Sequence, residues 1–195
     1  MKKILILILA LLSVFTFAAC DGGEVTDTQF DEFKLAYNAT VPVKIKVDVL
    51  FETTLGDLNS SFETTFNPNG SSKIVYSYDV FNEISSDGEI KSTVSGEIEC
   101  DKDGNYSDGG EFVGKNSVVS GVKLNLDASL IKSYSIEGDV LTATVAKENV
   151  KAVTGVDFGA DTVLMITKAD GKIISVSASY TAPTGNVSLI CYYTN

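Results

Sequence analysis

The sequence of 195 residues contains no histidine, no tryptophan and no arginine, and all 15 of its basic residues are lysine. Without histidine the chain cannot form a serine–histidine or cysteine–histidine nucleophile pair, and it offers no imidazole to a metal ion. Without arginine it has no planar guanidinium to bind a phosphate or carboxylate through two hydrogen bonds at once. These absences exclude most of the common hydrolase machinery. We therefore expect a protein that is not an enzyme and that holds neither a cofactor nor a metal ion.

Cysteine is also scarce, with three residues at Cys20, Cys100 and Cys191. Cys100 and Cys191 both fall on the apolar side of predicted strands, where a free cysteine behaves as a small hydrophobic residue. In an oxidising compartment the same two residues could instead form a disulfide. The sequence leaves both alternatives open, because it cannot show whether the two Cα atoms lie within bridging distance.

The first residues have the layout of a secretory signal peptide. Lys2 and Lys3 precede an apolar run over residues 4–17, and small residues follow it. This run is shorter than the roughly 20 apolar residues that a membrane-spanning helix needs. The pattern therefore predicts that residues 1–19 are a cleaved signal peptide.

The signal peptide ends in Phe17-Ala18-Ala19-Cys20, which resembles the lipobox of bacterial lipoproteins. The resemblance implies that Cys20 carries a diacylglycerol and becomes the first residue after cleavage. It also implies a protein outside the cytoplasm, anchored by this lipid to the bacterial cell membrane, with residues 20–25 as a polar tether. A plain signal peptide with an unmodified Cys20 is the alternative.

The remainder of the chain is strongly acidic. Removal of residues 1–19 takes away two lysines and leaves 176 residues, whose 13 lysines and 26 acidic residues give a net charge of −13. Such a surface repels nucleic acids and anionic membranes, so we expect no nucleic-acid partner. The length suits one domain with a substantial core, which we place at residues 26–195.

The best predicted helix covers residues 26–38. Phe30, Phe33 and Tyr37 recur on one face of it at helical spacing. We expect this aromatic stripe to pack against a sheet formed by the residues that follow.

After the helix the apolar period changes to two, which predicts a long half-buried strand over residues 41–52. Leu55-Gly56-Asp57-Leu58 then predicts a two-residue turn in which glycine supplies a positive φ. This turn places Phe51 opposite Phe62 in the next strand. A second hairpin is predicted from residues 73–84 and 89–100, with Tyr78 opposite Gly96 so that its ring covers the bare backbone.

The second half of the chain predicts more strands and a brief helical insertion. In order, the patterns indicate an alternating strand over 118–126, one helical turn within 127–132 and a hairpin of 133–137 with 140–146. A short helix over 147–153, ended by Gly155, follows. Two strands joined at Asp170-Gly171 and a last strand over 186–193 complete the chain. The last three strands carry apolar residues on both faces, with Val163, Met165, Val176 and Leu189 on one and Leu164, Ile166, Ile173 and Ile190 on the other. We therefore expect cover on both sides of these strands.

The predicted fold class is mainly β (α+β), with about ten antiparallel strands in a single strongly curled sheet or half-barrel, a short N-terminal helix and a small helical insertion. This order of elements, ending in strand, Asp170-Gly171, strand and strand, resembles the half-barrel of the outer-membrane lipoprotein carriers (LolA/LolB) and of the mycobacterial LppX-like lipoproteins. Those families hold lipid or acyl chains between sheet and helices. The resemblance implies an apolar ligand within the curled sheet. No arginine role carries over, because this chain has none.

Six residues are expected to line such a cavity: Phe30, Phe33, Tyr76, Tyr78, Gly96 and Val122. Several predicted inward positions are small or polar, namely Ser60, Thr64, Asn82, Ser92, Gly96 and Ser120. A core packed to normal density would prefer bulkier side chains there. Either the sheet lines a cavity, or the helix packs closest over these positions.

Two short motifs match catalytic or metal-binding patterns only in part. Ser129 and Lys132 have the Ser-x-x-Lys spacing of penicillin-binding enzymes, but the Lys-Thr-Gly strand that this chemistry also needs is absent. Residues 101–107 alternate acidic and polar side chains like the start of a calcium loop, but Tyr106 replaces the required glycine and no glutamate closes the loop. We interpret the first as chance and the second as a turn between strands.

Two functions remain open at this point. The first is a non-catalytic, lipid-anchored binding protein that holds an apolar or lipid ligand in the curled sheet. The second is a structural or interaction lipoprotein of the cell envelope, without a small-molecule ligand, that meets another envelope protein through the two-sided apolar strands at the C-terminal end.

Overall fold

The computed structural model describes residues 27–81, 91–103, 105–107 and 122–195, and these form one nine-stranded sheet with two short α-helices. The helices are α2 (Asp27–Ala39) and α3 (Lys147–Thr154), and one 3-10 turn is η2 (Ala128–Leu130). The strands are β1 (Lys44–Thr53), β2 (Gly56–Phe66), β3 (Ser72–Phe81), β4 (Lys91–Cys100), β5 (Ser133–Glu137), β6 (Val140–Val145), β7 (Thr162–Ala169), β8 (Lys172–Ala182) and β9 (Gly185–Thr194). The predicted signal peptide, Cys20 and the tether lie outside the described residues.

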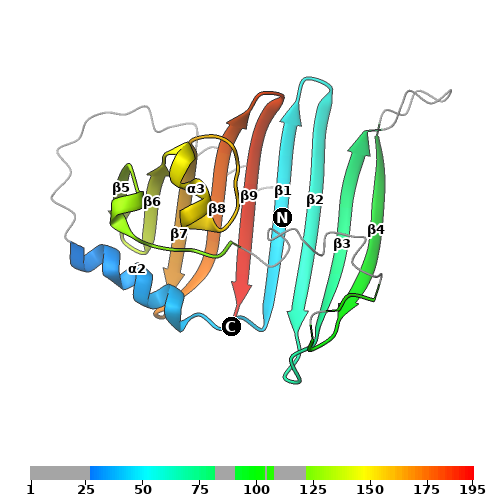
Figure 1. Ribbon diagram of the computed structural model, residues 1–195, viewed down its shortest axis with the longest axis horizontal. Helices are drawn as coiled ribbons and strands as arrows, with labels where there is room; N and C mark the ends of the chain where they lie inside the picture. The colour runs from blue at the N-terminus through cyan, green and yellow to red at the C-terminus, as the bar shows by residue number, and fades with distance from the viewer. Residues whose placement is uncertain (1–26, 82–90, 104, 108–121) are drawn as a thin grey trace.

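The sheet is built from two meanders that meet at the first and last strands. Its order is β4-β3-β2-β1-β9-β8-β7-β6-β5, and every neighbouring pair is antiparallel (Figure 1). β1 and β9 pair over their whole length, from Lys44 opposite Thr194 to Thr53 opposite Gly185. The mainly β class and the antiparallel sheet are as predicted. The sheet is open, but it is not strongly curled (Figure 1).

The helices cover part of one face of the sheet, and we call this whole face the inner face. α2 contacts β7 and β8, and α3 contacts β6 and η2 (Figure 1). The aromatic stripe of α2 packs on the sheet as predicted, since Phe30 and Phe33 are buried. Lys168 of β7 also binds α2, with its Nζ 2.6 Å from a carboxylate oxygen of Glu32. The helix therefore lies against one side of the inner face, and the sheet does not wrap around it.

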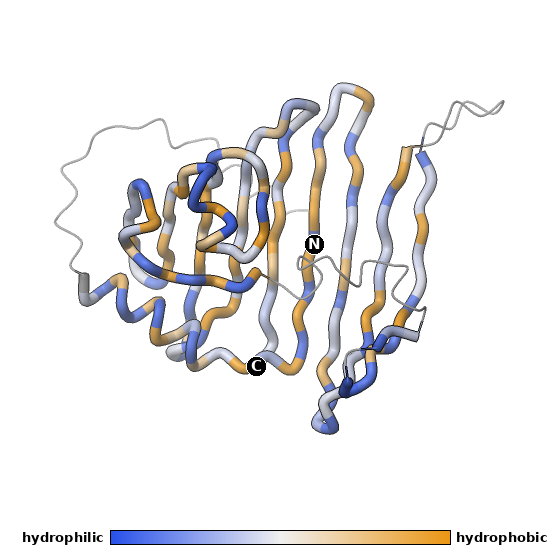
Figure 2. The backbone as a smooth tube through the Cα atoms, viewed as in Figure 1, coloured by the Kyte–Doolittle hydropathy of each residue, from blue (hydrophilic) through white to orange (hydrophobic). Residues whose placement is uncertain are grey.

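The core follows from the alternation of side chains along the strands. On the inner face Val47, Cys191, Val176, Ile166 and Leu141 stand opposite one another across five strands, and all five are fully buried. Figure 2 shows hydrophobic residues recurring along the strands and hydrophilic ones in the turns at 67–70 and 101–103. A smaller cluster between α3 and the strands contains Ala143, Val145, Val150, Val153, Leu164 and Ala178.

The first predicted hairpin has a different register. Val47, not Phe51, lies opposite Phe62, and the two-residue loop is Thr54-Leu55. Thr53 holds this loop, because its hydroxyl accepts from the backbone N–H of Leu55 and donates to the carbonyl of Gly56. Gly56 has a φ of 124° and begins β2 instead of occupying the loop. The shift is an even number of residues, so Phe62 still points to the inner face.

The second hairpin shows a similar shift. Tyr76, not Tyr78, lies opposite Gly96, and its ring covers this glycine. A Cβ placed on Gly96 would lie 2.6 Å from the Tyr76 hydroxyl oxygen. The predicted turn between these strands lies outside the described residues.

The predicted strand over 118–126 is wrong where the structure describes it. Residues 122–127 form no strand and run instead across the inner face beside α3. The backbone N–H groups of Lys123 and Asn125 donate to the carbonyls of Thr154 and Val153 at the end of α3. The alternation did identify the buried side, since Val122, Leu124 and Leu126 are all buried.

The remaining elements of the second half are confirmed. β5, β6, α3 and β9 lie where the patterns place them, and Gly155 ends α3 in the left-handed conformation with φ 76°. Asp170-Gly171 forms the two-residue loop between β7 and β8.

The last strands carry apolar residues on both faces, with the half-buried Val163, Met165 and Ile190 on the outer face, but the predicted membership of the two faces is wrong. Val176 and Leu189 share the inner face with Leu164 and Ile166, since Ile166 lies opposite Val176 and Ala178 opposite Leu189. A bulge at Thr167 and Lys168 turns Ile173 to the same face. Leu164, Ile166 and Ile173 are therefore fully buried within the monomer, and only Ile190 of that set stays partly exposed.

Cys100 and Cys191 are both free. Cys100 ends β4 at the edge of the sheet, whereas Cys191 lies in β9, four strands away. Four strand spacings of about 4.8 Å separate them by about 19 Å, far beyond the Cα distance of a disulfide. Burial raises the pKa of the Cys191 thiol to about 12, so this thiol is protonated and unreactive at neutral pH.

Candidate functional site

The six residues predicted to line a cavity do not converge on one site. Phe30 and Phe33 lie in α2, over β7 and β8, and are buried in the core. Tyr76, Tyr78 and Gly96 lie on the inner face of β3 and β4, at the other side of the sheet. Val122 is buried in the same core cluster as Phe30 and Phe33.

The two α2 phenylalanines are packing residues. The ring of Phe30 lies 4.9 Å from that of Tyr134 on β5. The ammonium of Lys168 lies 5.0 Å from the centre of the Phe33 ring, which is close enough for a cation–π contact. Both rings thus attach α2 to the sheet and leave no apolar surface of their own for a ligand.

The two tyrosines of β3 stack on one another, with ring centres 5.9 Å apart. Tyr76 also occupies the space over Gly96. The small residue at Gly96 therefore accommodates the tyrosine ring and does not open a cavity.

A cavity of about 320 Å³ lies elsewhere, where α2 ends and β1 begins. It is lined by Tyr37, Asn38, Thr40, Pro42, Ile45, Val122, Lys123 and Tyr193. Of the six predicted residues only Val122 belongs to it. The chain forms this cavity because α2 contacts β7 and β8, so the 40–43 connection must return across the sheet to β1.

Two tyrosine hydroxyls fix the segment that closes the cavity. Tyr193 of β9 donates a hydrogen bond to the carbonyl of Val122 at 3.1 Å, and the hydroxyl of Tyr37 accepts one from the N–H of Leu124 at 3.0 Å. Burial raises the pKa of Tyr193 far above its ordinary value of about 10. The Tyr193 hydroxyl therefore stays protonated and holds Val122 over the sheet across the whole neutral pH range.

Polar and apolar side chains share the lining of the cavity. Ile45, Val122 and Tyr193 form a buried apolar and aromatic part of its wall, and Asn38, Thr40 and Lys123 form a polar part. The backbone N–H of Ile173 and the carbonyl of Ala36 already satisfy the Thr40 hydroxyl. Lys123 supplies the only charge in the lining, and it is exposed. The described lining contains no aspartate, glutamate or cysteine side chain.

The two partial motifs are explained by local structure. The Ser129 hydroxyl donates to Asp127 at 2.8 Å, while the Lys132 ammonium lies 3.8 Å from Asp161. The carboxylate of Asp101 accepts hydrogen bonds from the N–H of Asp103 and from the N–H and side-chain amide of Asn105. These bonds form a turn stabilised by Asp101. No group of three metal-ligating side chains occurs among the described residues.

Sequence reasoning missed most of the cavity lining. Tyr37 was visible as part of the aromatic stripe, and Tyr193 only as the last residue of the final predicted strand. Nothing local indicated that they meet, because the lining comes from residues 37–45, 122–123 and 193. Within the described parts of the chain, no helix is long and apolar enough to cross a membrane.

Comparisons with known proteins add no family. No model of a protein family matches the chain, and no characterised protein sequence is significantly similar to it. One solved structure, described as a putative adenylyl cyclase from Hippeastrum with a dominant triphosphatase activity, aligns at 19% identity over 87% of this chain and 75% of its own. Its TM-score is 0.15, and at that value the likeness carries no argument about fold or function.

Proposed function

We propose that the protein is a non-catalytic, lipid-anchored protein outside the cytoplasm that binds a small apolar ligand in the cavity between α2, β1, β9 and residues 122–123. The observation that carries this proposal is the cavity itself, in whose mixed wall Tyr37, Pro42, Ile45, Val122 and Tyr193 supply the apolar and aromatic part. The absence of histidine and arginine and the protonated state of the buried Cys191 and Tyr193 support a binding role.

The size of the cavity restricts the ligand. Its 320 Å³ lies near the lower end of the range of about 300–1,000 Å³ that is typical of ligand sites. Such a volume suits one small apolar molecule or one short acyl chain better than a whole two-chain lipid. The exposed Lys123 adds a site for a polar end of that molecule at the entrance.

The alternative function, an interaction lipoprotein without a ligand, keeps only the half-buried Val163, Met165 and Ile190 of the outer face as its support. Leu164, Ile166 and Ile173 are covered inside the monomer and present no apolar surface to a partner. The ligand-binding proposal is therefore the one that the described residues support best.

Native mass spectrometry of the chain beginning at Asp21 tests the proposal. The core residues extend from Phe30 to Tyr193, so this form retains the whole described core. We expect a co-purifying apolar molecule at up to one per chain, recovered by solvent extraction. A chain that never carries such a molecule, after expression in its native host, would contradict the proposal.

A matched pair of variants locates the ligand. Ile45→Phe adds volume to the cavity wall and should lower ligand occupancy at least about fivefold with little loss of stability, since the added atoms fill empty space. Ile74→Phe is the control, because Ile74 is equally buried on the inner face but does not line the cavity. We expect it to keep the ligand while overpacking lowers the free energy of unfolding by about 1–3 kcal/mol.

A further inference from the structure

Exposed apolar side chains gather at the end of the sheet where β1 and β8 begin and β2 ends. Val41 is 76% exposed, Val43 54%, Ile174 40% and Phe66 38%. We call these four residues the apolar rim. Figure 2 shows hydrophobic residues in the connection between α2 and β1, beside the C-terminus.

Hydrogen bonds bring the rim together from three separate parts of the chain. The N–H of Phe66 donates to the carbonyl of Val43, and the N–H of Val43 donates to the carbonyl of Thr194. Ile173, the neighbour of Ile174, donates its N–H to the hydroxyl of Thr40, the neighbour of Val41. The four residues therefore lie along one continuous edge of the molecule.

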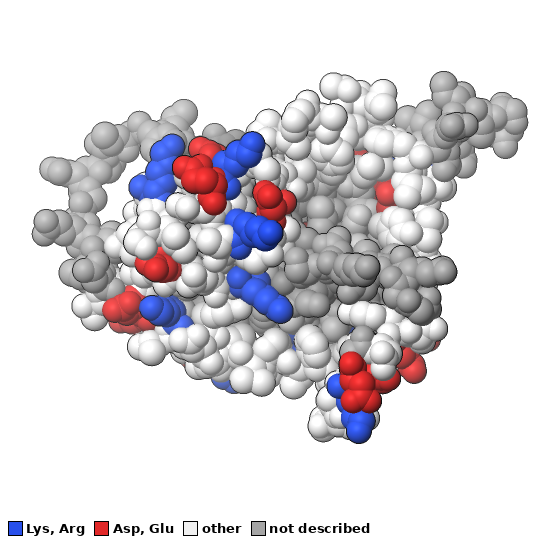
Figure 3. Space-filling model, viewed as in Figure 1, with Lys and Arg blue, Asp and Glu red and all other residues white. Residues whose placement is uncertain are grey.

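This edge contrasts with the rest of a strongly acidic chain. Residues 39–43, Ala-Thr-Val-Pro-Val, contain no charged side chain. In Figure 3 the described residues along the lower edge, from the end of α2 toward the turn at 67–70, are drawn almost entirely white. Acidic side chains gather in that view near α3, near the start of α2 and near residues 101–103. Lys44 follows Val43, and the exposed Lys172 lies two residues before Ile174, so lysines border an apolar edge that fits a lipid surface better than a cationic partner.

We propose that the apolar rim lies against the bilayer surface to which the protein is anchored, and contacts zwitterionic lipid. This inference rests on the proposed lipid anchor at Cys20. The length of the chain between anchor and fold allows this occupant. Seven residues from Cys20 to Asp27 span at most about 25 Å, and the 13 residues of α2 span about 20 Å. Val41 follows only two residues after the end of α2, so the anchor keeps the rim within reach of the lipid.

The rim also borders the cavity. Thr40 and Pro42 line the cavity and alternate along the chain with the rim residues Val41 and Val43. A rim in contact with lipid would place the cavity entrance beside the bilayer. An apolar ligand could then pass between bilayer and cavity without crossing water.

The absence of tryptophan from the sequence allows a direct test in the full lipidated protein. Phe66→Trp places a single fluorophore in the rim, and Val75→Trp places one at a comparably exposed site on the outer face of β3. Each protein is reconstituted in phosphatidylcholine vesicles with or without brominated acyl chains. We expect bromine to quench the tryptophan at 66 at least about threefold more than that at 75, because quenching requires contact with the acyl region.

A second pair of substitutions assigns the contact to the rim. Val41→Asp with Val43→Asp, in the Phe66→Trp protein, should abolish the excess quenching, because charged side chains do not enter the acyl region. Leu55→Asp is the control, since Leu55 is 68% exposed at the far end of β1 and should change nothing. All three positions are exposed, so none of these changes removes core packing.

Equal quenching at positions 66 and 75 in vesicle-bound protein would overturn the rim contact and leave the anchor intact. Failure of the protein to associate with vesicles at all would overturn the anchor and the rim proposal together. An unquenched tryptophan at 66 whose emission shifts to the blue with rising protein concentration would show a second copy of the chain on the rim, which also overturns the proposal.

Discussion

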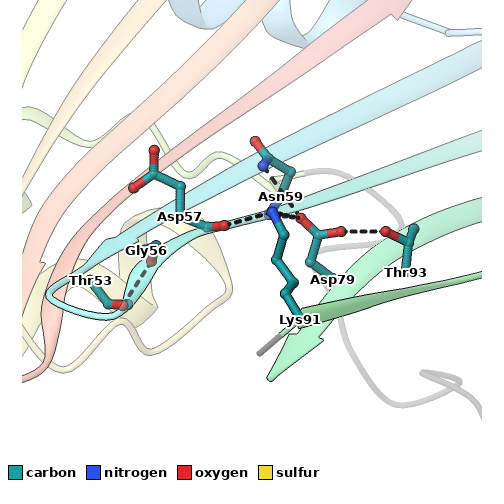
Figure 4. A network of polar contacts seen from close by, with 7 residues as sticks. All are labelled: Thr53, Gly56, Asp57, Asn59, Asp79, Lys91 and Thr93. Carbon is teal, nitrogen blue, oxygen red and sulfur yellow. Dashed lines mark hydrogen bonds and ion pairs between the residues drawn. The ribbon is translucent and has the colours of Figure 1, made fainter. Parts of the chain in front are cut away.

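Asp79 is a single residue whose side chain replaces backbone pairing between two strands. β2 and β3 pair only as far as Ser60 opposite Tyr78, and beyond that point the Asp79 carboxylate accepts the N–H of Asn59 at 3.0 Å. The same carboxylate accepts the Thr93 hydroxyl at 2.8 Å and lies 3.1 Å from the Lys91 ammonium (Figure 4). One side chain thus connects β2, β3 and β4 where the main-chain ladder ends.

Replacing this carboxylate should weaken the fold. Asp79→Asn removes the charge while keeping the shape, and hydrogen bonds to charged groups contribute about 1.5–3 kcal/mol. We expect the free energy of unfolding, measured in urea, to fall by about 2 kcal/mol. Asp57→Asn is the control, because Lys91 uses only the main-chain carbonyl of Asp57, and the Asp57 side chain points away (Figure 4). An equal loss in both variants would show that charge on this surface, and not the Asp79 network, sets the effect.

The Asp79 contribution should also depend on pH in a defined direction. The N–H of Asn59, followed by the Thr93 hydroxyl, holds the pKa of Asp79 well below its ordinary value, and Lys91 adds to this effect. The folded pKa is lower than the unfolded pKa of about 4, so the contribution is complete above about pH 4 and is lost as the pH falls below it. The stability gap between the parent and Asp79→Asn should stay constant from about pH 7 to pH 5 and narrow between about pH 4 and pH 2. A gap that is unchanged at the lowest pH would contradict this assignment.

At the scale of elements, the turn between β8 and β9 depends on close approach of two backbones. Gly185 pairs with Thr53 at the start of β9, and a Cβ there would overlap the carbonyl oxygen of Glu52. Gly185→Ala should therefore lower the free energy of unfolding by at least about 2 kcal/mol, because the two backbones must separate. Gly138→Ala tests the alternative of a purely conformational cost. Its φ is 58° but nothing lies within 4 Å of the added Cβ, so we expect a loss of only about 1 kcal/mol. Equal losses in urea titrations would refute the steric account.

Elements could be predicted from the sequence wherever the local turn decides the structure. Asp170-Gly171 fixes the β7–β8 hairpin because its two residues adopt positive φ, and Gly155 ends α3 for a similar local reason. The Leu55-Gly56 pattern was misleading, because hydrogen bonds of the Thr53 side chain select a loop two residues earlier. Residues 122–126 alternate like a strand, yet alternation reports only which side is buried. Their backbone partners are the carbonyls of α3, which no local pattern reveals.

At the scale of the whole molecule, the cavity could not be predicted. Its lining joins the end of α2, the start of β1, residues 122–123 and the last strand. These parts meet only because β9 inserts beside β1 and brings Tyr193 opposite Ile45. The sequence did indicate an inward face with aromatic residues. It placed the cavity beside Tyr76 and Tyr78, whose rings stack with their centres 5.9 Å apart.

In the proposed function, the lipid on Cys20 is what attaches the whole molecule to a membrane. A single acyl chain of the myristoyl type binds a bilayer with an association constant of only about 10⁴ M⁻¹, so stable residence suits the two chains of a diacylglycerol. The net charge of −13 after cleavage gives no electrostatic attraction to an anionic leaflet, and the apolar rim is too small to hold the protein alone.

Cys20→Ser should therefore abolish incorporation of labelled fatty acid and leave the protein uncleaved or release it into the medium. Cys100→Ser is the matched control, because Cys100 is a partly exposed thiol whose only described hydrogen bond goes to the carbonyl of Asp101. It should remain lipidated and membrane-bound like the parent. If Cys20→Ser is processed and retained on membranes as well, the anchor lies elsewhere and the orientation of the rim toward lipid loses its basis.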